Sequence, residues 1–355
     1  MKISSLLLSI GIGIGSLHAA PETEIQSLAG READSLVQLY KHLHSNPELP
    51  LREVNTSERI AKELESAGYT VTRNIGGHGL VGVLKNGAGP VVMIRTDLDG
   101  LPVIEETGLG YASTLRVKDH LGHDVGVMHA CGHDIHMTSF VGTARLLSKL
   151  KQQWSGTLLM VGQPAEEISV GSKAMLTDGI FRRFPLPDYI LALHSDAGLP
   201  AGKVRVRPGD AMAGTDTLDV TIRGVSGHGA YAYTTKDPIV LAAQTVMALQ
   251  TIVSREVPAV EPAVVTVGSI HGGTKHNIIP EEVRLEMTVR YYSDAVRERI
   301  LTSISRIAKG VAMAGGVPAD REPIVKLREP ESIPPVYNDP ELTRRVVGSM
   351  EGILG

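Results

Sequence analysis

The first half of the chain alternates between short apolar runs and stretches whose apolar residues recur at helical spacing. Leu36, Leu39 and Leu43 lie three or four positions apart, which predicts a helix over residues 25–46. Apolar runs bounded by turn residues predict strands over residues 69–72, 80–84, 91–94, 157–161 and 189–193. Two more helices are predicted, at residues 56–66 before the first strand and at about 133–147 between the third and the fourth. Strands that alternate with helices indicate an α/β sheet.

The pattern changes after Pro200. Residues 218–224 alternate between apolar and polar side chains, as a half-exposed strand does. Further strands are predicted at 264–270 and 283–291, and helices at 238–255 and 294–314. The order strand, helix, strand, strand, helix is that of a small ferredoxin-like α+β domain, with 324–327 as its closing strand. We therefore assign residues 204–327 to this second domain, and residues 21–203 and 328–355, which include a last helix at 340–353, to the first.

Composition and charge exclude some classes of partner. The 355 residues carry a net charge of −4, and the lysines and arginines form no long run. A nucleic-acid partner is therefore not expected. The hydrophobic content of 42% is ordinary for a globular protein large enough for two domains.

The first twenty residues have the features of a signal peptide. Lys2 precedes an apolar run, residues 6–17, and a small-residue cleavage site follows at residues 17–20. The run is short for a membrane span, although an uncleaved anchor is the alternative. No later stretch is long and apolar enough to span a membrane. The expectation is export to the periplasm or outside the cell, with no membrane association after cleavage.

Residues 128–136, Met-His-Ala-Cys-Gly-His-Asp-Ile-His, hold the chain's one cysteine and three of its thirteen histidines. Thiolate, imidazole and carboxylate are the side chains that bind borderline transition metals. Gly132 permits a tight turn, so Cys131 and His133 could face one point. The alternative is a helix N-terminus with a buried cysteine and some surface histidines.

Other candidate ligands follow two predicted strands. Glu166 and Glu167 come after the strand at 157–161, and His194 ends the strand at 189–193. Open α/β sheets bind their ligands beyond the carboxyl ends of the strands, which favours a metal site. Asp97 and Asp99 follow a third strand and could orient a metal-bound histidine. An equally good interpretation is that these two aspartates are solvated acids in a turn.

Five motifs that occur in one order carry a family resemblance: residues 93–102, 128–136, 163–167, 226–230 and 276–280. The chain from about residue 36 onwards resembles the metal-dependent amidohydrolases that include hippurate hydrolase, N-acyl-amino-acid hydrolases and plant indoleacetyl-amino-acid hydrolases. Aminoacylase and glutamate carboxypeptidases belong to the wider superfamily. The fold implied is α/β: a mixed-sheet metallohydrolase domain with an inserted ferredoxin-like lid and dimerisation domain.

The resemblance implies hydrolysis of the amide bond of an N-acyl amino acid by water that a metal ion activates. Cys131 would bridge two divalent ions, of manganese, zinc, cobalt or nickel. His133 and His194 would complete one ion, and Glu167 would bind the other. Glu166 would be the general base. Asp97 and Asp99 would orient the ligands.

The resemblance also implies roles for the second domain. It would be a lid through which two copies form a homodimer. His228 of one subunit would reach the other subunit's active site. Asn277 and Arg290 would contact the carboxylate end of the substrate, for which a guanidinium is well suited.

The chain departs from the family in two places. Residues 230–233 read Ala-Tyr-Ala-Tyr where the family usually has a proline. The family also continues beyond residue 355 and supplies its last histidine ligand there. The expectation is therefore a shortened member, and one alternative function is a weakly active or inactive folded dimer. A dipeptidase or carboxypeptidase on the same scaffold is the other alternative, although Cys131 favours acyl amino acids.

Overall fold

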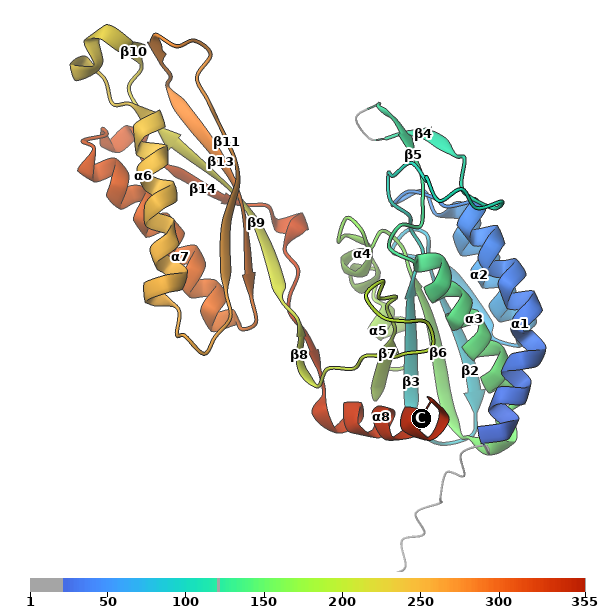
Figure 1. The fold of residues 1–355 in the computed structure, drawn as a ribbon. Helices are drawn as coiled ribbons and strands as arrows, with labels where there is room; N and C mark the ends of the chain where they lie inside the picture. The colour runs from blue at the N-terminus through green and yellow to red at the C-terminus, as the bar shows by residue number, and fades with distance from the viewer. Residues whose placement is uncertain (1–21, 120–121, 355) are drawn as a thin grey trace, which may run out of the picture. The chain divides into compact units, whose positions relative to one another are not determined.

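The computed structural model describes residues 22–119 and 122–354, and its chain divides into two compact units, Met1–Ala197 and Gly198–Gly355 (Figure 1). The predicted signal peptide, residues 1–20, lies outside the described residues. The predicted domain boundaries, with residues 328–355 returning to the first domain, stay predictions. In the described part of the chain, no helix has the length and apolar character that a membrane crossing requires.

A five-stranded mixed sheet forms the centre of the first unit. Its order is β1 (Thr70–Ile75), β2 (Gly79–Asn86), β6 (Gly156–Gln163), β3 (Val91–Asp97) and β7 (Tyr189–Ala192). β2 runs antiparallel to both neighbours, whereas β3 runs parallel to β6 and to β7. Asp97 pairs with Gln163 in this register. The chain therefore leaves β3, β6 and β7 at the same edge of the sheet.

Helices cover both faces of this sheet (Figure 1). Leu158 and Met160 of β6 pack in one apolar cluster with α1 (Glu22–Ser45), α2 (Val54–Ser66) and α3 (His133–Lys149). Leu159 and Val161 point the other way, into a cluster with α4 (Gly171–Thr177) and α5 (Ile180–Arg183). Successive strand residues face opposite sides, so a strand buried on both faces must be apolar throughout. This explains the unbroken apolar run that predicted the strand.

Short elements complete the first unit. β4 (Arg116–Lys118) and β5 (Asp124–Gly126) form an antiparallel ribbon, and a 3₁₀ turn covers Lys151–Gln153. The sequence pattern did not predict the ribbon, because each of its strands is three residues long, too short to show a periodic pattern.

A buried ion cluster ties α1 to the start of α3. Nδ1 of His44 lies 2.6 Å from Asp134 Oδ2, and its Nε2 lies 2.9 Å from Glu105 Oε1. Burial lowers the pKa of His44, but the two carboxylates more than offset this and hold the pKa above its ordinary value of 6.5. The two carboxylates therefore favour the charged form of His44.

This pKa makes the stability of the first unit depend on pH. Because the folded pKa is raised, the charged imidazole stabilises the fold fully below about pH 6.5, and that contribution is lost as pH rises through the folded value. Urea unfolding of wild type should show this loss, and His44→Gln should not. His42→Gln, an exposed residue of the same helix, is the control and should behave as wild type. Equal pH slopes for wild type and His44→Gln would contradict the assignment.

The second unit has the predicted split βαβ topology. β9 (Gly214–Arg223), α6 (Pro238–Thr251), β11 (Val264–Gly272), β13 (Glu282–Tyr291), α7 (Asp294–Ala314) and β14 (Ile324–Leu327) follow in that order. The sheet order is β11-β13-β9-β14, and every pair is antiparallel. Asp237 caps α6 and accepts a hydrogen bond from the N–H of Ile239. The two helices pack on the apolar face of the sheet, which confirms the ferredoxin-like prediction.

The remaining elements of this unit are small. β10 (Gly227–His228) pairs with β12 (Ile278–Ile279), and β8 (Gly209–Met212) pairs with β15 (Val336–Asn338). The 3₁₀ segment η2 covers Gly229–Thr234. Elsewhere in this unit, 3₁₀ turns cover Ala319–Arg321 and Glu329–Glu331, and a π-helical turn covers Ile252–Glu256. The last helix, α8, covers Pro340–Leu354.

Candidate metal centre

The metal-type side chains gather where the chain leaves the parallel strands. Asp97 ends β3, Glu166 follows the end of β6 by three residues, and His194 follows the end of β7 by two. α3 begins with His133 at the same edge. This arrangement agrees with the general observation that open α/β sheets bind their ligands beyond the carboxyl ends of the strands.

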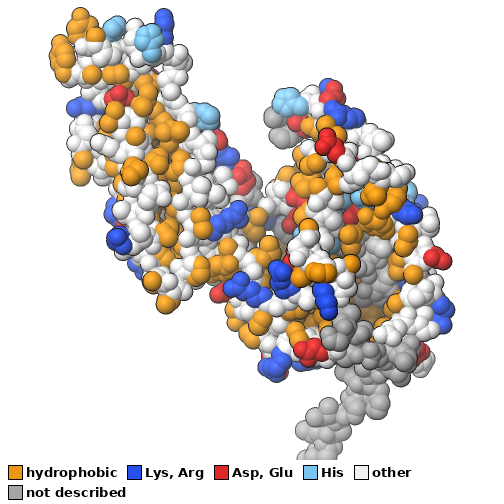
Figure 2. All heavy atoms as spheres, in the orientation of Figure 1, with side chains coloured by type: hydrophobic (Ala, Val, Ile, Leu, Met, Phe, Trp, Pro, Cys, Tyr) orange, Lys and Arg blue, Asp and Glu red, His pale blue; other side chains and the backbone are white. Residues whose placement is uncertain are grey.

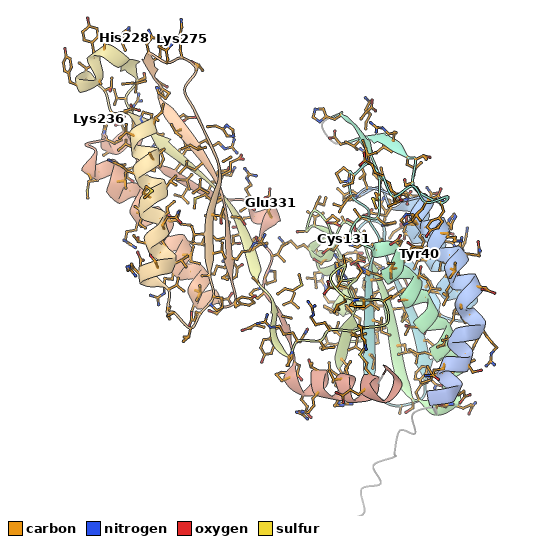
Figure 3. All side chains as sticks on the ribbon, in the orientation of Figure 1. Tyr40, Cys131, His228, Lys236, Lys275 and Glu331 are labelled. Atoms are coloured by element: carbon orange, nitrogen blue, oxygen red, sulfur yellow. The ribbon has the colours of Figure 1, made fainter. Side chains whose placement is uncertain are left out.

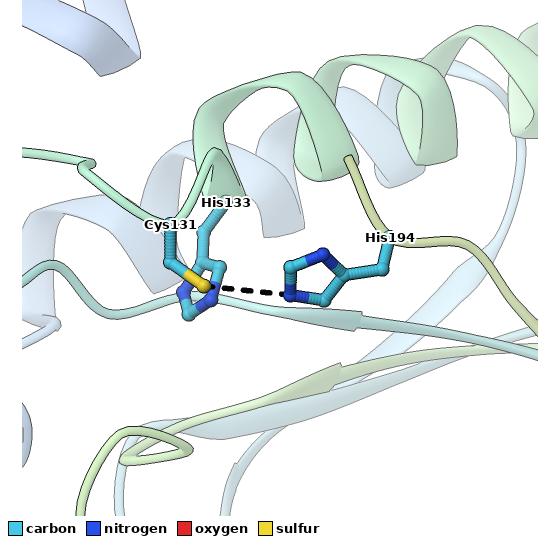
Figure 4. Close-up of side chains that lie close together, drawn as sticks. All are labelled: Cys131, His133 and His194. Carbon is cyan, nitrogen blue, oxygen red and sulfur yellow. Dashed lines mark hydrogen bonds between the residues drawn. The ribbon is translucent and has the colours of Figure 1, made fainter. Parts of the chain in front are cut away.

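Gly132 makes the turn that brings Cys131 beside His133 (Figure 4). Its φ of 81° lies in the left-handed region, and a Cβ there would collide with Oγ of Ser195. Cys131, His133 and His194 each offer a ligand atom, and the three atoms lie within 4.8 Å of one another. Sγ of Cys131 is 3.4 Å from Nε2 of His194 (Figure 4).

Both histidines present the nitrogen that a metal needs. Nδ1 of His133 donates to the backbone carbonyl of Asp99 at 2.7 Å, and Nδ1 of His194 donates to the carbonyl of Ser195 at 2.7 Å. These bonds leave Nε2 of each ring with its lone pair. Nε2 of His133 is buried and has no hydrogen-bond partner among the described residues. It lies 3.6 Å from Oε1 of Glu167 and 3.8 Å from Oε2 of Glu166.

These residues fit a transition metal. Oε1 of Glu167, like Nε2 of His133, is buried without a hydrogen-bond partner in the described part of the chain. Two such acceptors facing each other are costly unless a cation lies between them. Thiol, imidazole and carboxylate donors together suit zinc and its neighbours in the first transition row.

Asp97, the last residue of β3, and Asp99, two residues later, are both buried. The alternative that they are solvated acids in a turn is therefore wrong. Asp97 is 1% exposed and Asp99 is 0% exposed. Oδ1 of Asp97 accepts a hydrogen bond from Nδ1 of His136 at 2.8 Å. Asp99 accepts the backbone N–H groups of Glu166 and Glu167, each at 3.0 Å. Asp99 therefore fixes the segment that carries the two glutamates.

An acid, a histidine and a serine lie together here, as in a serine-hydrolase triad, but the serine is not activated. They are Asp97, His136 and Ser195. Nε2 of His136 accepts the backbone N–H of Ser195 at 2.8 Å, so its lone pair is already used. Oγ of Ser195 donates to the carbonyl of Cys131 at 3.0 Å. The three residues therefore hold the turn at Cys131 in place and do not form an activated nucleophile.

The electrostatics of the centre favour binding a cation. Burial, followed by the charges of Glu167 and Glu166, raises the pKa of the Cys131 thiol to about 12. Burial also raises the pKa of Glu167; His133 opposes this shift and Glu166 adds to it. For Asp97 burial is opposed by the hydrogen bond with His136 and by the charge of Arg95, and its pKa falls below the ordinary range. A divalent ion would favour the ionised forms of Cys131 and Glu167, whose pKa values burial and neighbouring carboxylates raise.

The three predicted substrate residues lie at two ends of the second unit. His228 pairs with Ile278 between β10 and β12, and the N–H of Gly229 donates to the carbonyl of Asn277 at 2.9 Å. His228 and Asn277 are thus neighbours near the labelled Lys275 (Figure 3). Arg290 pairs with Thr215 at the far end of β13. Arg290 lies eight positions after Glu282, the first residue of β13, and this distance along the strand is roughly 25 Å. One small substrate cannot touch Arg290 and Asn277 of the same copy.

A protein-family model described as peptidase family M20/M25/M40 matches residues 93–355. The chain belongs to this family. An N-acetyldiaminopimelate deacetylase of Leuconostoc citreum is 38% identical over 323 residues, which are 90% of this chain and 79% of that protein. An N-acetylcysteine deacetylase of Bacillus subtilis is 34% identical over 294 residues, 80% of this chain and 72% of that protein.

A solved structure extends the comparison to the fold. It is a dinuclear metal binding peptidase of the M20 family from Bacillus subtilis, with a TM-score of 0.75 and 29% identity over 92% of this chain and 81% of that one. The M20 protein described here is a metal-dependent amidohydrolase with the predicted α/β fold. Those two predictions are confirmed. The metal's identity and the number of ions stay predictions.

Three residues that support this M20 site were not predicted. His136 and Ser195 hold the turn at Cys131, and Glu53 binds the backbone beside the two glutamates. His136 lies in the metal-type stretch, so its presence near the site could have been expected. Ser195 and Glu53 carry no signal in the sequence, because each acts on backbone atoms of a distant segment.

Proposed function

We propose that this M20 protein hydrolyses the amide bond of N-acyl amino acids, and of N-acetyl amino acids foremost. The observation that carries the proposal is the buried pairing of two unpartnered acceptors, Nε2 of His133 and Oε1 of Glu167, beside the Cys131 thiol, among the described residues. Two relatives whose names state deacetylation of acetylated amino acids support this substrate class.

The proposed ligands divide between two divalent ions. Cys131 would bridge both ions. His133 and His194 would complete the coordination of one ion, and Glu167 would bind the other. Manganese, zinc, cobalt and nickel all suit this donor set. When bound, the ions would polarise the amide carbonyl and make the attacking water acidic.

Glu166 is the proposed general base. Its side chain is 38% exposed, against 16% for Glu167, so it is the more open of two adjacent carboxylates. A general base must reach the water it deprotonates and then return the proton to the leaving amine. The carboxylate of Glu166 has that freedom, while Glu167 is the more deeply held and suits a ligand.

The proposed substrate contacts come from two copies of the chain. Arg290 would contact the α-carboxylate of the substrate, and His228 would reach the site from the partner subunit. Asn277, the neighbour of His228, would then come from the partner as well. Dimerisation through the second unit accounts for the separation of these residues along β13. β11 is an edge strand of that unit's sheet, and such strands can pair across a two-fold axis. Figure 2 shows hydrophobic side chains over η2, where Tyr231 and Tyr233 are 58% and 85% exposed.

The shared site predicts complementation between two inactive variants. His228→Ala and Glu166→Gln should each be inactive alone. Dissociation, mixing and reassociation should restore about a quarter of wild-type activity, because half the dimers are mixed and each has one intact site. Activity of the mixture after native reassociation is the measurement. If both variants are inactive alone, sediment as dimers and recover no activity when mixed, His228 acts within its own subunit. If His228→Ala is active alone, His228 has no role in the reaction.

The function itself is tested on metal-loaded protein. We expect release of the free amino acid from N-acetyl-diaminopimelate, N-acetylcysteine or related N-acyl amino acids, and none after chelation. N-benzoyl amino acids test the size of the acyl group, and dipeptides test the peptidase alternative. Cleavage of dipeptides alone would overturn the proposed substrate class.

Export of the mature chain stays a prediction from residues 1–20.

A further inference from the structure

The segment that carries Glu166 and Glu167 has a strained backbone. Ala165 is fully buried and has a φ of +46°, a region that non-glycine residues rarely adopt. Such a conformation persists only where surrounding contacts hold it. Gly171 closes the turn from the other side, where a Cβ would collide with the carbonyl of Pro164.

Three successive backbone N–H groups of this segment point at two buried carboxylates. The N–H of Ala165 donates to Oε1 of Glu53 at 2.6 Å. The N–H groups of Glu166 and Glu167 donate to the two oxygens of Asp99, at 3.0 Å each. Consecutive N–H groups arranged around anions form a nest, and here the anions are side chains of the chain itself.

Glu53 does not serve the helix at whose start it lies. It is the residue before α2, yet its side chain makes no cap bond to that helix. Glu48 takes that role instead: its carboxylate accepts the N–H of Asn55 at 3.2 Å and of Thr56 at 2.8 Å. Glu53 is 0% exposed, and its Oε2 has no hydrogen-bond partner in the described part of the chain. A buried carboxylate so placed is costly and calls for a function other than capping.

We propose that Glu53 is a positioning residue for the active site: by accepting the N–H of Ala165 it holds the strained turn that aims Glu166 and Glu167 in different directions. Asp99 holds the next two N–H groups and so constrains the peptide that follows Ala165. The peptide that precedes Ala165, on which its φ depends, is held by Glu53. The proposal rests on the proposed roles of the two glutamates as base and ligand. Its tests include readouts that do not depend on catalysis.

Hydrogen exchange of the metal-free full chain tests the contact directly. Glu53→Leu keeps the volume and removes the acceptor, and should speed exchange of the peptide that covers residues 164–171 by about tenfold. Glu53→Gln keeps an acceptor oxygen and should restore wild-type exchange. Glu48→Leu is the matched control: it should speed exchange at the start of α2 and leave 164–171 unchanged.

Cobalt binding tests the consequence for the site. The Glu53→Leu variant should bind cobalt about tenfold more weakly at the Glu167 ion and show an altered visible absorption spectrum, while Glu53→Gln should match wild type. With substrate, kcat should fall and KM should change little. Should Glu53→Leu fail to fold, Glu53→Asp, whose carboxylate is one methylene short of Ala165, replaces it with the same expected results.

Three outcomes would overturn the proposal. One is wild-type exchange and cobalt spectra in the variants that lose the acceptor. Another is an equal change at 164–171 in Glu48→Leu, which would show general loosening of α2. The third is failure of Glu53→Gln to rescue, which would mean that charge matters and not the bond to Ala165. Absence of hydrolysis in wild type would refute the proposed function alone, because exchange and cobalt binding are measured without substrate.

Discussion

Glu166→Gln should lower kcat by about 10²- to 10⁴-fold and leave metal content unchanged. The amide cannot take a proton from water, yet it keeps the size of the carboxylate and its place beside Glu167. The backbone of this residue is held by Asp99, so the substitution should not move the segment. Turnover of an N-acetyl amino acid and metal analysis of the same sample are the measurements.

Glu167→Gln is the matched variant, one residue along the chain and held by the same aspartate. Its buried Oε1 faces Nε2 of His133, so loss of the charge should weaken metal binding as well as activity. If the two variants lose metal to the same extent, the division into base and ligand is wrong. If Glu166→Gln keeps full activity, another group takes the proton.

Cys131→Ala should have the second large effect, loss of metal binding by more than about 100-fold and loss of activity with it. Changing groups that merely orient a ligand costs 10- to 100-fold in affinity, and a ligand shared by two ions should cost more. Because the chain has one cysteine, the near-ultraviolet charge-transfer band of the cobalt-loaded protein can come from Cys131 alone. That band should vanish in the variant.

His123→Ala is the control for Cys131→Ala, because it removes an exposed imidazole of the first unit near the β4–β5 ribbon. It should bind cobalt with wild-type affinity and keep the band. Unchanged cobalt stoichiometry and spectrum in Cys131→Ala would remove the thiol from the ligand set. The centre would then rest on imidazole and carboxylate alone.

The sequence by itself determined the longer helices and strands and the edge of the sheet at which the chemistry would lie. The apolar run of β6 and the alternation of β9 are local patterns that follow from which faces of a strand are buried. Asp97, Glu166 and His194 each follow a strand, and parallel strands bring such residues to one edge. The resemblance carried by the five ordered motifs predicted the family, which the comparisons confirm.

Only the tertiary structure decided how those side chains are oriented. The tautomers of His133 and His194 depend on backbone carbonyls of Asp99 and Ser195 that accept their Nδ1–H groups. The burial of Asp97 and Asp99 distinguished supporting acids from solvated ones. These hydrogen bonds join a side chain to backbone carbonyls, of a distant segment for His133 and of the next residue for His194, and backbone atoms carry no residue-specific pattern.

The structure also separated residues that the sequence had grouped. Asn277 and Arg290 are thirteen positions apart in the chain, yet the direction of β13 carries Arg290 to the other end of the sheet. Glu53 and Ala165 are the reverse case, since 112 positions separate two residues in contact at 2.6 Å. Periodicity reports which face of its own element a residue occupies. Which distant segment meets that face is determined by packing of the whole unit, which is why the supporting contacts of the metal centre were found only in the fold.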